Sequence, residues 1–293
     1  MKLFLILALL CTPVIARADD TITIGLYAPT APFGGTGDRV SFVNALADHL
    51  SSSAGGRKVQ GKVFSSAGAF AAAVQKGDVQ FAIVDAPYAA AQGLPYHILA
   101  SAVRGGGSTG AWILVGRAGV AHLSDLKGKK IVAPATGAKQ GAFITNALFE
   151  GEIDATFFDK ILDAADPKSA LTMVSVGKAD AAVVPSGVEV PGGLSTVMTL
   201  RSIGWPMFVA APGANAELEK SFAAAITSFS SGGAFSGFAA GDAGHYRALA
   251  GSFGKDVKKG PLAVPPPARL SVRDLLEGRS FTLPSSNVLD LIK

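Results

Sequence analysis

The sequence has almost no cysteine. The only one among 293 residues is Cys11, which lies in the N-terminal segment interpreted below as a leader. A mature chain without cysteine has no disulfide, no thiolate nucleophile and no cysteine-ligated metal. A chain of this length can still bury enough apolar surface to fold without disulfides. The histidines, His49, His97, His122 and His245, share no metal-ligand spacing, so we expect no metal site.

Charge is also scarce, because Asp, Glu, Lys and Arg make up only 16% of the residues. The net charge of +4 falls to +2 (24 basic against 22 acidic residues) without Lys2 and Arg17 of the leader. The sequence has no basic run and no interleaving of basic and aromatic residues, so we expect no nucleic-acid partner. The low charge predicts a large core or an unusually apolar cleft.

Long hydrophobic runs are missing too. The longest one near the N-terminus, residues 3–10, is too short to span a bilayer. It follows Lys2 and precedes Ala16-Arg17-Ala18, which matches the small-x-small rule for signal-peptide cleavage. We therefore predict a signal peptide over residues 1–18, cleavage after Ala18 and a periplasmic location. The bulky Leu10 before Cys11 argues against a lipid-anchored start.

A repeat organises the rest of the chain. Residues 69–88 read AFAAAVQKGDVQFAIVDAPY, and residues 170–189 read ALTMVSVGKADAAVVPSGVE. In each copy a helical pattern ends at Gly77 or Gly177, since glycine readily takes the left-handed conformation that closes a helix. A short apolar run follows, typical of a buried parallel strand. Because ligands bind beyond the carboxyl ends of such strands, the repeat predicts two lobes that face one cleft.

The fold class that we expect is α/β, with a mostly parallel sheet flanked by helices in each lobe. Strand-like segments at 111–116 and 205–211 bracket a self-contained α/β unit. We therefore assign residues 19–110 and 205–293 to lobe 1 and residues 111–204 to an inserted lobe 2, joined by a two-crossing hinge. Helices are expected from Asp38 or Ser41 to Leu50, over 141–150 and over 215–229. The arm that begins at Pro265 is not assigned to either sheet.

The glycine-rich run at 105–110 fits both the GxGxxG and the GxSxG patterns. Both patterns require a helix immediately afterwards, whereas residues 111–115 look like a strand. We interpret the run as a flexible crossing loop at the edge of the cleft, with Ser108 or Thr109 in contact with a ligand.

Three segments resemble the phosphate/phosphonate-type periplasmic solute-binding proteins, within the type II periplasmic binding protein superfamily. They are TIGLY at 23–27, GDVQFAIVDAPYA at 77–89 and LSDLKGKKIVAPATG at 123–137. The resemblance covers residues 21–212. It implies the substrate-binding component of an ABC transporter, which captures a small molecule by domain closure and delivers it to a membrane permease. It further implies a monomer with no cofactor and no catalytic residue.

The sequence departs from that family at three places. Where the family usually has Ser-Thr-Ser-Gly, residues 135–140 carry only one hydroxyl, that of Thr136. Pro185 stands where a carboxylate usually follows the second repeat's strand, and the usual histidine is replaced near Asp166. A less polar ligand is therefore an alternative, with a cleft walled by Tyr27, Pro29, Phe33, Pro87, Tyr88 and Trp112. The protein would then be a carrier of a lipid or another hydrophobic molecule. A second alternative is an exported enzyme on the same fold.

The expected ligand contacts follow the strand ends and the crossing loop. The helix expected over 141–150 is entered through Thr136 and Gly137, so its N-terminus leaves free N–H donors for an anion there, and Lys139 adds charge. Asp85 either bonds a ligand or hinge water, or caps the turn before Pro87. The predicted ligand-binding residues are Tyr27, Asp85, Tyr88, Ser108, Thr109, Thr136, Gly137, Lys139 and Ser186.

Overall fold

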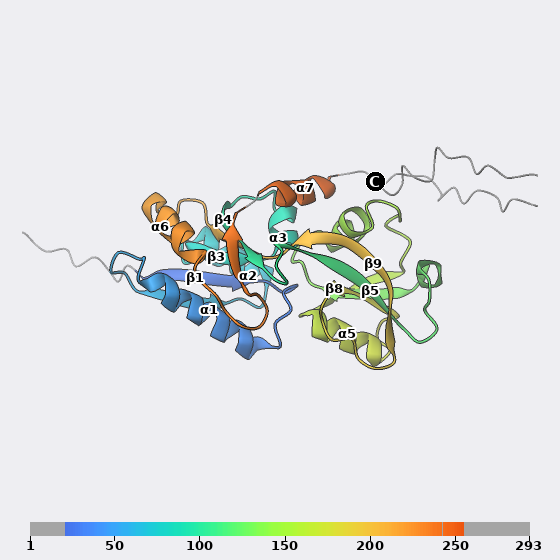
Figure 1. Ribbon diagram of the computed structural model, residues 1–293. Helices are drawn as coiled ribbons and strands as arrows, with labels where there is room; N and C mark the ends of the chain where they lie inside the picture. Colours follow the sequence, from blue (N-terminus) through green and yellow to red (C-terminus); the bar gives the residue numbers. More distant parts are fainter. Residues whose placement is uncertain (1–20, 242, 255–293) are drawn as a thin grey trace, which may run out of the picture. The chain divides into compact units, whose positions relative to one another are not determined.

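The computed structural model describes residues 21–241 and 243–254, which are built on two mixed β-sheets flanked by helices (Figure 1). The predicted signal peptide, its cleavage site and the Pro-rich arm lie outside the described residues. Within the described part of the chain, no helix is both long enough and apolar enough to cross a membrane.

The first sheet has six strands in the order β11-β4-β10-β3-β1-β2. Strand β1 pairs in parallel with β2 and β3, and β10 lies antiparallel between β3 and β4. Four of the six strands therefore run in one direction, and β10 and β11 run in the other. The strands are β1 (Ile22–Tyr27), β2 (Val59–Val63), β3 (Phe81–Val84), β4 (His97–Val103), β10 (Met207–Ala210) and β11 (Gly237–Ala240).

The second sheet has five strands in the order β7-β6-β8-β5-β9. Strand β6 pairs in parallel with β7 and β8, and β5 lies antiparallel between β8 and β9, so only β5 runs against the others. The strands are β5 (Thr109–Arg117), β6 (Lys130–Pro134), β7 (Lys160–Ala164), β8 (Ala181–Pro185) and β9 (Leu194–Gly204). Both sheets match the predicted α/β class.

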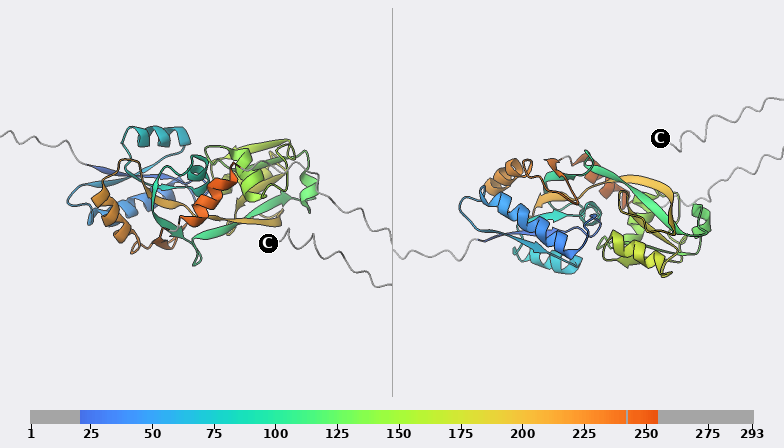
Figure 2. Two further views of the ribbon diagram at one scale, coloured as in Figure 1. Left: turned by 90° about the horizontal axis from the view of Figure 1, so that it is seen from above. Right: turned by 60° about the horizontal axis from the view of Figure 1, so that its bottom comes forward.

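The helices of the first sheet cover an aromatic core. Helix α1 buries Phe42 among the rings of Phe33, Phe229, Phe235 and Phe238. Helices α1 and α6 contact one another, as the further views show (Figure 2). The phenylalanines at 222, 229, 235 and 238 are all buried in this core. These helices are α1 (Thr36–Ser51), α2 (Ala67–Gln75), α3 (Ala86–Ala91) and α6 (Ala216–Ile226).

Two helices differ from the sequence expectation. Helix α1 begins at Thr36, before either predicted start, and has no side-chain N-cap. The helix expected over 141–150 is a short α-helical turn, α4 (Gln140–Ala142), that continues as a π-helix, η2 (Phe143–Leu148). The second sheet also carries a 3₁₀ turn, η1 (Leu123–Leu126), and helix α5 (Pro167–Ser175).

The repeat is confirmed as two helix–strand units, α2–β3 and α5–β8. Gly77 and Gly177 close their helices with φ of 78° and 74°. The side chain of Ser66 caps α2, and that of Asp166 caps α5 by accepting the Ser169 N–H at 2.7 Å. Strands β3 and β8 are both interior strands of their sheets, which explains their unbroken apolar sequences.

The chain passes between the sheets twice, after β4 and after β9. The first crossing includes a turn at Gly105 and Gly106, both with positive φ, and leads into β5 rather than into a helix. The GxGxxG and GxSxG patterns therefore lack the helix that they require. A last helix, α7 (Gly244–Ser252), packs against α3 and β9, and its Tyr246 hydroxyl donates to the Trp205 carbonyl at 3.0 Å. The exact lobe boundaries stay a prediction.

Candidate ligand-binding site

The two predicted site tyrosines are packed into the core. Tyr27 ends β1 and Tyr88 lies in α3, and their side chains are almost fully buried. Their ring centroids are 5.0 Å apart, and Phe70 lies 5.6 Å from Tyr27 and 5.8 Å from Tyr88. Burial raises the pKa of both phenols above their usual value, so both stay neutral. Trp112, an expected cleft wall, is also buried and packs on Phe143.

Asp85 follows β3 and is completely buried. Its Oδ2 accepts the backbone N–H of Thr30 at 2.7 Å, and its Oδ1 has no hydrogen-bond partner among the described residues. Burial raises the pKa of Asp85 to about 7, although the Thr30 bond and the charge of Arg39 act in the opposite direction. Of the two roles expected for Asp85, side-chain capping of α3 does not occur. Its bond to Thr30 instead ties the loop after β1 to the end of β3.

At the predicted anion cradle before α4, the polar groups of Thr136 and Gln140 bond within the loop. The N–H of Thr136 donates to Gln140 Oε1 at 2.9 Å. The Thr136 hydroxyl lies 2.7 Å from the same oxygen and 3.0 Å from the Ala138 carbonyl, so its only proton is used within the loop. The side-chain amide of Gln140 donates to the Pro134 carbonyl at 3.1 Å. Lys139 is exposed, with a left-handed backbone at φ 50°.

Gly137, the next predicted residue, lies directly against groups attached to the first sheet. A Cβ at this position would be 2.6 Å from the Ala67 Cβ and 2.7 Å from the Tyr27 hydroxyl oxygen. Its φ of 81° also favours glycine. The Tyr27 hydroxyl therefore lies in close contact with this loop.

The remaining predicted contacts belong to the crossings and to the end of β8. Ser108 accepts the Trp205 N–H through its backbone carbonyl at 2.8 Å, and Thr109 begins β5 opposite Gly204. The backbone N–H of Ser186 donates to the Ala111 carbonyl at 2.8 Å. These backbone bonds fix the crossings, while the three side chains carry no hydrogen bond among the described residues.

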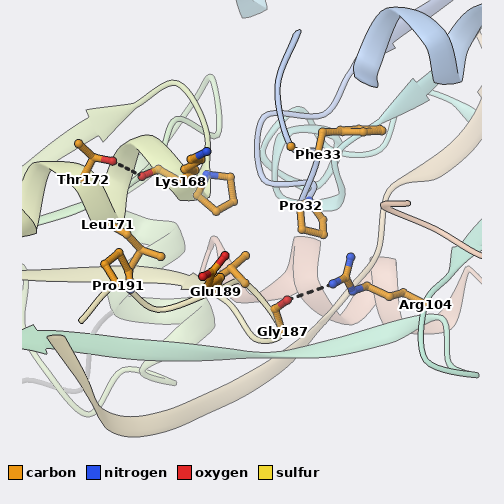
Figure 3. Close-up of a pocket in the computed structure, with 12 residues that line it drawn as sticks. Pro32, Phe33, Arg104, Lys168, Leu171, Thr172, Gly187, Glu189 and Pro191 are labelled. Atoms are coloured by element: carbon orange, nitrogen blue, oxygen red, sulfur yellow. Dashed lines mark hydrogen bonds between the residues drawn. The ribbon is translucent and has the colours of Figure 1, made fainter. Parts of the chain in front are cut away.

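A cavity of about 450 Å³ lies next to these residues (Figure 3). We call it the Arg104 cavity. Pro32, Phe33 and Arg104 lie on one side of it, and Lys168, Leu171 and Pro191 lie on the other. Its full lining is Pro32, Phe33, Gly34, Arg104, Pro167, Lys168, Leu171, Thr172, Gly187, Val188, Glu189 and Pro191. None of the nine predicted contacts is in that lining, so they stay predictions; Phe33 was expected as a wall and does line the cavity.

Arg104 holds the two sides of the Arg104 cavity together. It follows β4, and its Nη1 donates to the Ala234 carbonyl at 3.0 Å, while its Nη2 donates to the Gly187 carbonyl at 3.1 Å. Its guanidinium also lies 6.0 Å from the centroid of the Trp205 ring. No carboxylate of the described residues lies within ion-pair distance of it. Sequence reasoning missed Arg104, although it directly precedes the glycine-rich crossing and is therefore placed at the hinge.

Comparison with known families places this fold. The sequence matches the family described as ABC transporter, phosphonate, periplasmic substrate-binding protein over residues 38–246, which is more than half of the chain. The chain belongs to this family. This confirms the resemblance found in the sequence. A comparison with curated proteins gives no match.

Solved structures of phosphonate-family and related proteins share the fold. PhnD1 from Prochlorococcus marinus, solved with methylphosphonate, superposes with a TM-score of 0.62 at 10% identity, covering 79% of this chain and 96% of that one. A binding component of an ABC phosphonate transporter from Pseudomonas aeruginosa gives 0.60 at 14% identity, covering 77% and 82%. A Xanthomonas citri protein solved with ATP gives 0.65 at 13% identity, covering 80% and 96%. The two-lobed architecture is thus shared, at identities too low to carry over a ligand.

Proposed function

We propose that this periplasmic substrate-binding protein captures a small ligand in the Arg104 cavity and delivers it to an ABC-type importer. The match to the family over residues 38–246 is the observation that carries the proposal. The cavity supports it, because its lining comes from loops of both sheets and from helix α5, so a bound molecule would touch segments attached to both sheets. A ligand that contacts both lobes favours the closed state.

The size of the cavity favours a small molecule over the lipid alternative. Pockets for small ligands span about 300–1,000 Å³, and 450 Å³ lies in the lower half of that range. A lipid carrier would need aromatic side chains along its cleft. The aromatic residues expected there are instead buried in the core: Tyr27, Tyr88 and Trp112. We therefore propose a solute importer component rather than a lipid carrier.

A thermal-shift screen of the exported protein tests the proposal. The panel is inorganic phosphate, methylphosphonate, short organic carboxylates and sulfonates, and amino acids, each at millimolar concentration. A ligand at 1,000 times its Kd adds about 4 kcal/mol to the free energy of unfolding, so the Tm should rise clearly. Native mass spectrometry of the untreated protein checks for a molecule that co-purifies. No shift across the panel together with no bound molecule would contradict the function.

A pair of variants on α5 tests the place of binding. Thr172 lines the Arg104 cavity and is exposed, so Thr172→Phe should fill part of it and abolish the ligand-induced rise in Tm. Ser175 is also exposed on α5 but lies outside that lining, so Ser175→Phe serves as the matched control. A ligand that still stabilises Thr172→Phe as strongly as the control binds elsewhere.

Three further properties belong to the same proposal. We propose that the ligand leaves the protein chemically unchanged, which the mass of the recovered ligand tests. We propose that the protein is a monomer with lobes at 19–110 plus 205–293 and 111–204, which light scattering and limited proteolysis test. Cleavage after Ala18 should give a periplasmic protein that begins at Asp19, as intact mass will show.

A further inference from the structure

The charge and shape of the Arg104 cavity point to a class of ligand, an inference that rests on the proposed function. We propose that the cavity takes a singly charged organic anion, a carboxylate or sulfonate with an apolar body, and that Arg104 is its anchor.

The anionic group of the ligand is expected at Arg104 because this guanidinium has N–H donors that the fold does not use. A guanidinium carries five N–H donors, and Arg104 uses one for the Ala234 carbonyl and one for the Gly187 carbonyl. Neither carbonyl neutralises its charge, and no described carboxylate lies within 4 Å of it. Arg104 is half-buried at the cavity wall, where a charge is screened less than on the open surface. Its remaining N–H groups match the planar oxygens of a carboxylate.

The number of negative charges is limited by the rest of the lining. Lys168 and Glu189 both line the cavity, and both are exposed, so solvent screens both charges and their opposite signs offset each other. Arg104 is then the one half-buried cation of the lining, and it balances a single negative charge. The loop that would cradle a phosphonate dianion has already used the N–H and hydroxyl of Thr136. One charge on the ligand therefore fits this site better than two.

The body of the ligand is expected to be apolar. Pro32 and Phe33 line the cavity on the same side as Arg104, and Leu171 and Pro191 line it on the opposite side (Figure 3). Apolar contact of this kind contributes about 25 cal/mol for each Å² removed from water. Binding would also tighten the bond between Arg104 and Gly187, because an anion holds the guanidinium at the junction of the two sides.

The experiment is isothermal titration with hexanoate, benzoate and hexanesulfonate, compared with inorganic phosphate and methylphosphonate. We expect the three organic monoanions to bind and Arg104→Gln to weaken them about 10- to 100-fold, the loss of a charge-assisted hydrogen bond. Lys168→Gln, which removes an exposed charge and no hydrogen bond of the fold, should weaken them a few-fold. Arg247→Gln removes an exposed cation outside the lining and should leave binding unchanged.

A spectroscopic readout separates a local effect from misfolding. Only two tryptophans occur in the chain, and Arg104 lies over the ring of one of them, Trp205. A monoanion on Arg104 should change the tryptophan emission of the wild type and of Lys168→Gln, but not that of Arg104→Gln. Thermal unfolding of each variant shows whether it is folded. If Arg104→Gln does not fold, the few-fold loss in Lys168→Gln and the emission change still test the inference.

The outcomes of these experiments test the proposed ligand class separately from the proposed transport function. Tight binding of phosphate or methylphosphonate that is insensitive to Arg104→Gln would overturn the ligand class and leave the transport function in place. Failure of all three monoanions to bind would also overturn the ligand class, whereas the function is judged by the wider panel and by native mass spectrometry.

Discussion

Replacing Asp85 by asparagine should stabilise the protein at neutral and alkaline pH. The wild type there holds an ionised carboxylate in a fully buried site with one oxygen unpaired among the described residues. Burial raises the pKa of Asp85 from 3.8 to about 7. At 1.36 kcal/mol for each pKa unit, the ionised form costs about 4 kcal/mol of stability. Asparagine keeps an oxygen for the Thr30 N–H and carries no charge.

The sign of the pH dependence follows from the raised pKa. Between about pH 4 and pH 7 the folded protein keeps a proton that the unfolded chain has released. The contribution of Asp85 to stability therefore falls as the pH rises through this window, and it is constant above it. Of the total, about 2.5 kcal/mol should be lost between pH 5 and pH 8.

Guanidinium unfolding of the wild type and of Asp85→Asn at pH 5 and pH 8 measures this loss. The wild type should lose about 2.5 kcal/mol more than the variant between the two pH values. Asp48→Asn, which removes an exposed carboxylate on α1, should follow the wild type. An Asp85→Asn variant with the wild-type pH dependence, or one less stable than the wild type at pH 8, would refute the reasoning.

Three other substitutions test the contacts between the sheets. Gly137 has a φ of 81°, and a Cβ there would lie 2.6 Å from a neighbouring carbon, so Gly137→Ala should lower the free energy of unfolding by about 1–3 kcal/mol. Gly68→Ala, in open space on α2, should not lower it. Equal stabilities of the two variants would contradict this. Gly110→Ala would place a Cβ 2.1 Å from the Trp205 ring, so tryptophan emission should shift, and an unchanged spectrum would show that the ring is not held there. Tyr246→Phe removes a buried hydrogen bond to the Trp205 carbonyl and should cost about 1 kcal/mol in denaturant unfolding; no cost would mean that the bond contributes nothing.

Much of the fold follows from local patterns that burial imposes. The runs at 81–84 and 181–184 are apolar without alternation because β3 and β8 are interior strands covered on both faces. The glycines after α2 and α5 predict where these helices end, since a left-handed backbone conformation favours glycine. The two crossings lie where the strand-like segments at 111–116 and 205–211 placed them.

Other elements have no local signal. Strand β11, Gly237–Ala240, is short, contains small residues and exists because β4 offers it a free edge. The π-helix at Phe143–Leu148 has the same apolar sequence as an ordinary buried helix, so only its hydrogen-bond pattern distinguishes it. The observed ends of some elements also differ from the predicted ends. At α1 no side-chain cap marks the start of the helix.

The candidate site was harder to predict, because its chemistry depends on which polar groups remain unused after folding. The sequence correctly places Thr136 and Gly137 just after the carboxyl end of β6. It does not show that the N–H and the hydroxyl of Thr136 both bond to the side-chain oxygen of Gln140. Arg104 is a single basic residue before a glycine-rich loop. The sequence around it does not predict that its guanidinium bonds to Gly187, 83 residues later.

The hydrogen bonds of the loop after β6 and the position of Arg104 favour the same place for an anion. In the loop after β6 the N–H and hydroxyl of Thr136 bond within the loop, and a Cβ on Gly137 would lie 2.7 Å from the Tyr27 hydroxyl oxygen. An anion that used the donors of Thr136 would first have to break their bonds to Gln140. The Arg104 cavity demands no such exchange, since its guanidinium keeps both carbonyl partners while its other donors face the ligand. Recognition in this protein is therefore expected to rest on a side-chain cation at the crossing, with the apolar part of the lining beside it for an organic body.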